Sequence, residues 1–487
     1  MVIGNGGVVT TWGVDIGFGY DSSTNPTGNS NNSLLVTGSN SALNASSYVA
    51  VGDGGDKNSL VINDGAQASI GTGYVGYDGN GNSLVLSNGA SLTASNGFYV
   101  GYGDTDTNIP TANNNSAIIT GSNTTASLYV AYVGDVKYAN GNSNTLTISD
   151  GAQVSASGIY LGSVEYTSET VAGGGYANSL NVSSGATLSN SSGLYIGYSE
   201  YGNGANSNTV TVNQGTMINS DIVYVGYGYY NGYYGSNYSL NPGGNENSLL
   251  ITSNSVFTST GLTIGYGGDN QYNVSGGDGN YVTINASSVT NTGDLVIGFA
   301  DYGLGGNYNS LTLTNGASLT SSGNLYVGTN SDPADWTGGN GNTLTVAGGS
   351  TLTIALNTLI GDGGNSNTVT ITDSNSTLNA SGGVTLGANG SFNMLLVSNG
   401  ATLVAGSVDV GNNQMSNSIS NSIIVTGPGS SITAPGGVWL GDGADQNLLV
   451  VSNGATVASG GGYVGDRRSV RKVFRVRQRY LGPGRDR

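Results

Sequence analysis

The chain has no cysteine and no histidine, and only 8% of its 487 residues are charged. The absence of cysteine excludes a disulfide framework and a thiolate metal site. About a quarter of the residues in an ordinary globular enzyme are charged, so the low charge argues against a cytosolic enzyme. No run of about 18 apolar residues occurs that would form a membrane-spanning helix. The chain is rich instead in glycine (85 residues) and tyrosine (30 residues), with many Asn, Ser and Thr.

The few charges are distributed unevenly. Residues 1–466 contain two basic residues, Lys57 and Lys137, and 27 of the 28 acidic ones. The last 21 residues contain eight arginines and one lysine. Because nucleic-acid binding requires a cationic surface, the acidic body predicts no nucleic-acid partner.

Internal repetition dominates the chain. Each repeat opens with Asn and an alternating apolar segment, as in NTLTI at 144–148, and ends in an aliphatic residue and glycine, as in FYVG at 98–101. A turn and a second short alternating segment lie between. The opening residues of fifteen repeats, 24 to 39 residues apart, are Asn32, Asn58, Asn82, Asn115, Asn144, Asn178, Asn208, Asn247, Asn280, Asn309, Asn342, Asn367, Asn393, Asn421 and Asn447.

Three short strands of period two, separated by turn residues, predict one coil of an all-β, right-handed parallel β-helix (β-solenoid). Fifteen such coils, stacked at about 4.8 Å each, predict a rod about 70 Å long. A helical fold competes poorly, since glycine interrupts every few residues. We expect a partial N-terminal coil over residues 1–31, the solenoid over 32–466 and a basic non-repeat tail over 467–487.

Alternation also predicts which side chains point into the coil. In the repeat that opens at Asn82, the expected inward residues are Leu84, Leu86, Ala90, Leu92, Phe98 and Val100. The closing glycine predicts a turn with positive φ, and the opening asparagine predicts a stacked amide ladder.

The pattern N-[ST]-L-x-[VIL], G-[AST]-x-[LV], [LF]-[YTV]-[VIL]-G recurs over residues 32–465. It resembles the repeat shared by the passengers of bacterial autotransporters (type V secretion) and by PEP-CTERM surface proteins. The resemblance implies an extracellular β-helix at the surface of a Gram-negative bacterium, associated with its outer membrane. It also implies a signal peptide and an outer-membrane β-barrel translocator or a sorting tail. We recognise none of these in the sequence, so we expect a truncated or misassigned N-terminus.

The basic tail starts where a sixteenth repeat is due. It has three interpretations: a solvated arm, an anchor for anionic lipid or polysaccharide, or the product of a frameshift. We favour the frameshift, because arginine is absent from the first 466 residues and then occurs eight times in 21.

Parallel β-helices also include polysaccharide-processing enzymes, which use paired carboxylates or a basic residue. Acidic residues do recur at one place in the repeat, at Asp53, Asp56, Asp104, Asp106, Asp442 and Asp445. Turn residues are the favoured interpretation, and a Ca²⁺ site is the weaker alternative. We therefore predict no enzyme activity, no catalytic residue, no metal site and no cofactor.

Function in a solenoid is expected on its outward positions. Two residues before the closing glycine, six consecutive repeats carry tyrosine: Tyr74, Tyr99, Tyr132, Tyr160, Tyr195 and Tyr224. A stacked ladder that stabilises the coils is one interpretation. The other is a binding strip for an extracellular glycan or for the surface of a host or neighbouring cell, helped by Tyr77, Tyr102, Tyr198 and the tyrosine-rich stretch at 227–238.

A second outward position is the middle of the first strand. It is apolar in the first four repeats and in the last three, and it is threonine in the ninth to twelfth. These apolar residues are either covered by the segments between coils or exposed where another rod packs. The apolar positions are Leu35, Val61, Val85, Ile118, Leu396, Ile424 and Val450.

Taken together, the sequence predicts a secreted structural and adhesive stalk that binds weakly at many points. A polysaccharide-processing β-helix enzyme and an inert extracellular-matrix component are the alternatives.

Overall fold

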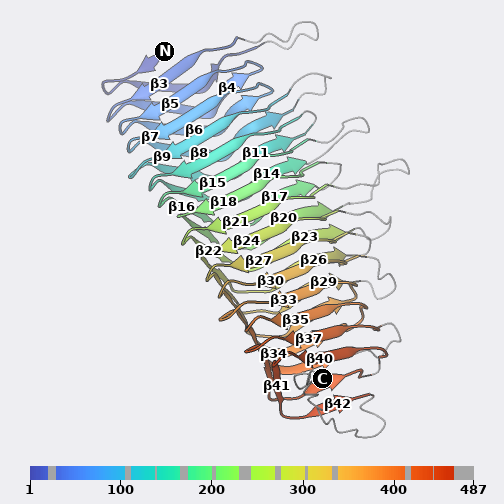
Figure 1. The fold of residues 1–487 in the computed structure, drawn as a ribbon. Helices are drawn as coiled ribbons and strands as arrows, with labels where there is room; N and C mark the ends of the chain where they lie inside the picture. Colours follow the sequence, from blue (N-terminus) through green and yellow to red (C-terminus); the bar gives the residue numbers. More distant parts are fainter. Residues whose placement is uncertain are drawn as a thin grey trace, which may run out of the picture.

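The computed structural model is a stack of β-strands that follows the sequence from one end of a rod to the other (Figure 1). It describes residues 1–19, 29–104, 111–137, 140–164, 174–199, 204–229, 243–268, 276–301, 305–331, 338–411, 418–442 and 444–465. The basic tail, Asp106 and most of the stretch at 227–238 lie outside these residues. Among the described residues there is no helix, and hence none that would cross a membrane.

The first strands of all coils form one parallel sheet of 16 strands, each paired with the first strand of the next coil. Its members are β1 (Val2–Ile3), β3 (Ser33–Thr37), β5 (Ser59–Asn63), β7 (Ser83–Ser87), β9 (Ser116–Thr120), β12 (Thr145–Ser149), β15 (Ser179–Ser183), β18 (Thr209–Asn213), β21 (Ser248–Thr252), β24 (Tyr281–Asn285), β27 (Ser310–Thr314), β30 (Thr343–Val346), β33 (Thr368–Ile371), β35 (Met394–Ser398), β37 (Ser422–Thr426) and β40 (Leu448–Ser452).

The second and third strands stack in the same parallel way. The separate second strands are β10 (Thr125–Leu128), β13 (Gln153–Ala156), β16 (Thr187–Asn190), β19 (Thr216–Asn219), β22 (Val256–Ser259), β25 (Ser288–Asn291), β28 (Ser318–Ser321), β31 (Thr351–Ile354), β38 (Ser431–Ala434) and β41 (Thr456–Ser459). The separate third strands are β11 (Ala131–Val136), β14 (Ile159–Val164), β17 (Leu194–Ser199), β20 (Ile222–Tyr229), β23 (Gly261–Gly268), β26 (Leu295–Asp301), β29 (Leu325–Asn330), β32 (Thr358–Asp362), β39 (Val438–Leu440) and β42 (Gly462–Val464).

In the remaining coils the second and third strands are continuous, which the sequence did not predict. The continuous strands are β2 (Val8–Ile16), β4 (Ala42–Asp53), β6 (Gln67–Tyr77), β8 (Ser91–Gly103), β34 (Thr377–Leu386) and β36 (Thr402–Val410). The corner is still present as a shift of register, for example between Ile70 and Thr72 in β6. A bulge of this kind bends a strand without ending its ladder. The predicted all-β parallel β-helix is confirmed.

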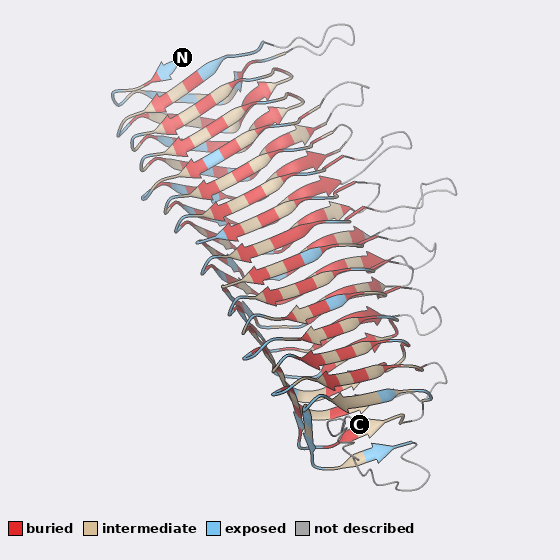
Figure 2. Cartoon of the chain, in the orientation of Figure 1, coloured by how far each residue is buried: buried red, intermediate tan, exposed pale blue. Residues whose placement is uncertain are grey.

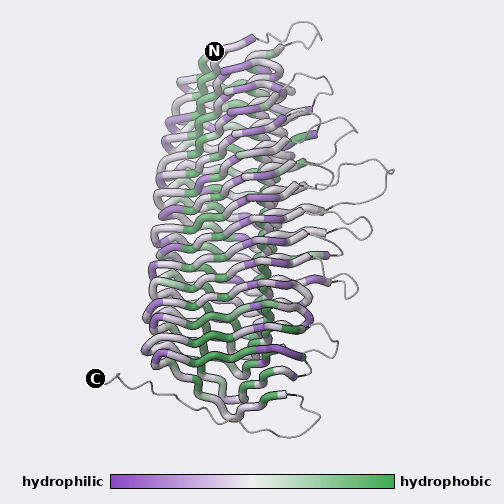
Figure 3. Tube along the Cα trace, turned by 45° about the vertical axis from the view of Figure 1, so that its right-hand side comes forward, coloured by the Kyte–Doolittle hydropathy of each residue, from purple (hydrophilic) through white to green (hydrophobic). Residues whose placement is uncertain are grey.

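The core is a continuous column of aliphatic side chains inside the coils. Buried and less buried residues alternate along the strands in Figure 2, and hydrophobic columns run the length of the rod in Figure 3. All six residues predicted to point inward in the repeat of Asn82 are at most 2% exposed. Side-chain alternation in a strand therefore predicted the core correctly.

The opening asparagines form the predicted amide ladder along the edge of the first sheet. In one rung, Asn144 Oδ1 accepts the backbone N–H of Asn115 at 2.9 Å and the Asn115 side-chain amide at 3.1 Å. Asn144 in turn donates its backbone N–H and its side-chain amide to Asn178 Oδ1, at 2.8 and 3.2 Å. These rung-to-rung bonds join each coil to its neighbour and fix the register of the stack.

The closing glycines adopt positive φ, as predicted, and the ladder gives them a second constraint. Gly101 has φ +79°, and a Cβ built on it would overlap the Asn144 amide. The repeat therefore requires glycine for the backbone conformation and also for the space that the amide rung occupies.

Candidate functional site

The six predicted tyrosines come together in one column on the outer face of the third strands. Strand pairing places Tyr99 in register with Tyr74 and with Tyr132, and the same register continues to Tyr160, Tyr195 and Tyr224. The column lies on β6, β8, β11, β14, β17 and β20. Each tyrosine is half-buried, with a buried residue on either side of it in the strand.

The rings of this tyrosine column are stacked face to face. Centroids of successive rings lie 5.1, 4.8, 5.0, 4.9 and 5.2 Å apart, with interplanar angles of 3 to 18°. The four interior rings each have a neighbour on both faces. A ligand that approaches the column thus meets ring edges and hydroxyl groups. The faces of these four interior rings are covered by other rings, so a sugar cannot stack on them.

A second aromatic column runs beside the first, three residues downstream. Its rings fall in two segments, because Asp135 and Ser163 occupy this position in the two coils between them. The segments are Tyr77 and Tyr102, and then Tyr198, Tyr227, Tyr266 and Phe299. From Tyr198 to Phe299 they stack at 4.8 to 5.2 Å. The two columns touch edge to face, as in Tyr195–Tyr198 at 5.2 Å and 76°.

Four members of this column were noticed in the sequence as loop tyrosines near the strip, but not as a column. Strict alternation puts residues three apart on opposite faces. Gly76, with φ +81°, shifts the alternation by one residue, so Tyr77 faces outward like Tyr74. The spacing Tyr-x-Gly-Tyr, as at 74–77 and 224–227, is the signal that would have predicted it.

Carboxylates anchor the tyrosine hydroxyls of the second column at two places. Tyr77 donates its hydroxyl to Asp104 at 2.7 Å, and Asp104 also pairs with Lys137 at 2.9 Å. Tyr266 donates its hydroxyl to Asp301 at 3.1 Å. Burial, reinforced by these carboxylates, raises the pKa of Tyr77 and of Tyr266 well above the usual value for a phenol. The phenols are therefore protonated hydrogen-bond donors at neutral pH.

The acidic residues that recur in the repeat have different surroundings. Burial and the nearby Asp15 raise the pKa of Asp53 to about 6. Asp56 accepts the backbone N–H of Asn80 at 2.8 Å, and it thereby belongs to a second ladder two residues upstream of the first. The same ladder continues, for example, from Asn113 to Asn80 at 2.9 Å. Asp442 and Asp445 lie at the C-terminal end of the rod, away from the tyrosine column.

This second ladder was not predicted, although the motif Asn-x-Asn, as at 113–115 and 142–144, is its signal. The middle residue of the motif takes positive φ, as in Asn114 at 59° and Ser143 at 57°. The two asparagines that flank the left-handed residue bond to opposite neighbours. Asn113 Oδ1 accepts the backbone N–H of Asn142 in the following coil, and Asn115 Oδ1 accepts that of Asn82 in the preceding one.

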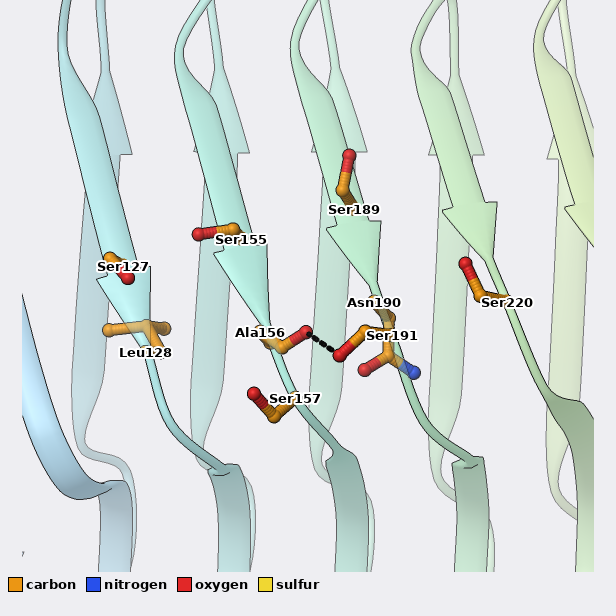
Figure 4. Close-up of a pocket in the computed structure, with 9 residues that line it drawn as sticks. All are labelled: Ser127, Leu128, Ser155, Ala156, Ser157, Ser189, Asn190, Ser191 and Ser220. Carbon is orange, nitrogen blue, oxygen red and sulfur yellow. Dashed lines mark hydrogen bonds between the residues drawn. The ribbon is translucent and has the colours of Figure 1, made fainter.

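A shallow groove of about 220 Å³ crosses four coils at the ends of the second strands (Figure 4). Its lining is Ser127, Leu128, Ser155, Ala156, Ser157, Ser189, Asn190, Ser191 and Ser220, with no carboxylate or basic group. Within the groove, Ser191 donates its hydroxyl to the carbonyl of Ala156 at 3.5 Å. Within the part of the chain that the structure describes, no three acidic residues gather as a metal site would require.

The apolar positions in the middle of the first strands form in-register columns on the outer face of the first sheet. Leu35 pairs with Val61, Val61 with Val85, and Val85 with Ile118. Ile118 is 36% exposed, and the others are half-buried. One expectation was that the segments between coils cover these apolar residues, but most of those segments lie outside the described residues.

Comparison of the chain with models of protein families, with curated proteins and with solved structures found no match.

Proposed function

We propose that the chain is the structural and adhesive rod of a secreted, cell-surface protein, similar to an autotransporter passenger or a PEP-CTERM surface protein. The observation that carries the proposal is the register of the tyrosine column. Six identical side chains recur at the strand spacing of about 4.8 Å on one face of a stiff rod. A ligand with its own repeat, such as an extracellular polysaccharide, matches such an array.

The contacts would be made by phenol hydroxyls and ring edges. Each hydroxyl both donates and accepts a hydrogen bond, and burial raises the pKa of Tyr74, Tyr195 and Tyr224, so these phenols keep their protons. Single contacts of this kind are weak. Six of them on one rigid support add by multivalency, which is the physical advantage of a repeat rod over a pocket.

Secretion through an outer membrane would suit the fold. Each asparagine rung hydrogen-bonds to the rung of the neighbouring coil, so the chain can fold one coil at a time outside the cell. This step implies a translocator as partner and an extracellular or outer-membrane-associated location.

The test is a triple variant, Tyr99→Ser, Tyr132→Ser and Tyr160→Ser, screened with the full chain on a glycan array and on bacterial cells. We expect loss of most binding while the far-ultraviolet circular dichroism stays that of a β-solenoid. The matched control is Thr263→Ser with Thr385→Ser, at the same position of other coils, which should bind like the wild type. Equal binding by the triple variant and the wild type would falsify the proposal.

A purely structural rod without a ligand is the second candidate. It is favoured by the stacking itself, because a ladder whose ring faces are occupied stabilises neighbouring coils whether or not anything binds. A wild-type chain that binds nothing in the same screen would favour this candidate.

A further inference from the structure

The two aromatic columns form one connected network. Ring contacts of 4.8 to 6.1 Å link eleven tyrosines and Phe299 without a break: Tyr74, Tyr77, Tyr99, Tyr102, Tyr132, Tyr160, Tyr195, Tyr198, Tyr224, Tyr227 and Tyr266. The network crosses eight coils, which at the usual strand spacing is about 34 Å. Most tyrosines of a protein have no such set of ring neighbours.

We propose that this network is a site of oxidative modification, at which a one-electron oxidant of the peroxidase class, with hydrogen peroxide, joins tyrosines of adjacent coils as dityrosine. The geometry carries the proposal: each interior ring of the tyrosine column lies within 5.2 Å of the ring of the coil before it and of the coil after it. Two radicals formed anywhere in the network are therefore never far from a partner ring.

Coupling of two tyrosines removes two electrons and two protons from the pair. Each of two phenols gives one electron to the oxidant and its hydroxyl proton to water or to a hydrogen-bonded carboxylate. The two phenoxyl radicals then form one carbon–carbon bond between ring carbons ortho to the oxygens. The two ring hydrogens at that bond move to the phenol oxygens, so the product has lost two hydrogens in total. One hydrogen peroxide accepts the two electrons and two protons and becomes two waters.

Two features of the structure assist the oxidation. Asp104 and Asp301 accept the hydroxyl hydrogens of Tyr77 and Tyr266, so a base is already in place for the proton that leaves with the electron. Stacked and edge-to-face rings at these distances allow the oxidised site to pass along the network until it meets a second radical. The chain lacks cysteine, so dityrosine would supply the covalent link between coils that a disulfide supplies elsewhere.

The chain also offers matched tyrosines outside the network. Tyr308 is 73% exposed and Tyr129 is 57% exposed, whereas the network tyrosines are half-buried. If access to the oxidant decided the outcome, these two residues would react first. If proximity between rings decides it, the network reacts in spite of its lower exposure.

The experiment oxidises the full chain at high dilution with horseradish peroxidase and hydrogen peroxide, follows dityrosine fluorescence, and maps linked peptides by mass spectrometry. We expect intramolecular links, each with a loss of two hydrogens, between neighbours such as Tyr99 and Tyr132. The variant Tyr99→Phe, Tyr132→Phe, Tyr160→Phe keeps the ring stack and should lower the yield several-fold. The control variant Tyr129→Phe, Tyr308→Phe should keep the wild-type yield.

Three results would overturn the proposal: links mainly at Tyr129 or Tyr308, links only between molecules, or an unchanged yield in the triple phenylalanine variant. Circular dichroism of each variant shows that the solenoid is intact. The adhesive role can fail independently, because it is read from ligand binding without oxidant.

Discussion

The continuous strands β8 and β34 belong to distant coils, and their third-strand segments are alike on the inside and different on the outside. Phe98 and Val100 in β8 and Val384 and Leu386 in β34 are all buried. In both coils the next residue, Gly101 or Gly387, is a glycine of positive φ that faces an asparagine rung. The outward residue between the buried pair is Tyr99 in β8 and Thr385 in β34. The solenoid fixes the inward and ladder positions in every coil and leaves the outward position free to differ between regions.

Replacement of a closing glycine is expected to have the largest effect. Gly101→Ala forces a Cβ into a left-handed conformation and into the space of the Asn144 amide, at a combined cost of about 4 kcal/mol. Gly89→Ala is the control, because Gly89 has a similar φ of +74° but no atom within 4 Å of the added Cβ. Urea unfolding of both variants measures the difference. Equal losses would show that the amide rung does not constrain the glycine.

Removal of one asparagine rung is expected to have the second largest effect on stability. Asn144→Ala leaves two N–H groups of Asn115 without their acceptor in a buried position and should cost about 3 kcal/mol in the free energy of unfolding. Asn342→Ala, whose rung accepts the same two bonds from Asn309, should cost as much although its coil lacks the tyrosine column. A clear difference between the two variants, measured by urea unfolding, would contradict the view that the ladder is uniform.

The tyrosine column should contribute less than the ladder. Tyr132→Ser removes two stacked ring pairs and is expected to cost about 2 kcal/mol. Thr385→Ser, at the corresponding outward position, should change stability by less than about 0.5 kcal/mol. Thermal unfolding of the two variants compares the regions directly. A Tyr132→Ser variant as stable as the wild type would mean that stacking adds nothing to the fold.

The smallest effect is expected from a carboxylate within the second ladder. Asp278 accepts the backbone N–H of Asn307 at 2.7 Å, and burial raises its pKa to about 6. The folded state thus binds a proton more tightly than the unfolded state. Stability contributed by the protonated form is full below about pH 4 and is lost as the pH rises through about 6.

We therefore expect Asp278→Asn to be more stable than the wild type above pH 6, by about 1 kcal/mol, and to lose this pH dependence. The reverse change at a matched rung, Asn340→Asp, should introduce the same dependence. Unfolding free energies from pH 4 to pH 8 test both variants. A wild-type stability that rises between pH 4 and pH 6 relative to Asp278→Asn would have the wrong sign.

The sequence predicted those features that depend on strict alternation and on repetition. Leu92 and Phe98 are buried because alternation along the strand places them at inward-facing positions. Tyr99 pairs in register with Tyr132 because each precedes its closing glycine by two residues. These relations are local to one repeat. They hold although the repeats differ in length, because the strands of each coil pair with those of the next whatever the length of the segment between them.

Features that depend on the left-handed residues were missed. Tyr77 joins the outer face only because Gly76 shifts the alternation, and the second ladder forms only because the middle residue of Asn-x-Asn reverses the backbone. The contact between Tyr102 and Tyr99 then depends on the turn of Gly101. Strict alternation does not include the change of face at a left-handed residue, so it did not predict that the two columns lie side by side.

The central claim is that the tyrosine column, and not the frame beneath it, binds a ligand. Substitutions can build a similar column at the same position of coils nearer the C-terminal end of the rod. Six outward positions on consecutive coils lie in register: Tyr326, Leu359, Thr385, Asp409, Trp439 and Tyr463. Tyrosines at the three non-aromatic positions would complete a separate column of six aromatic rings.

The most direct measurement is therefore the glycan-array binding of a chain that carries Tyr99→Ser, Tyr132→Ser and Tyr160→Ser together with Leu359→Tyr, Thr385→Tyr and Asp409→Tyr. We expect the three serine changes alone to abolish most of the binding and the three added tyrosines to restore it. Binding that survives the serine changes, or that is not restored by the new column in a correctly folded chain, would contradict it.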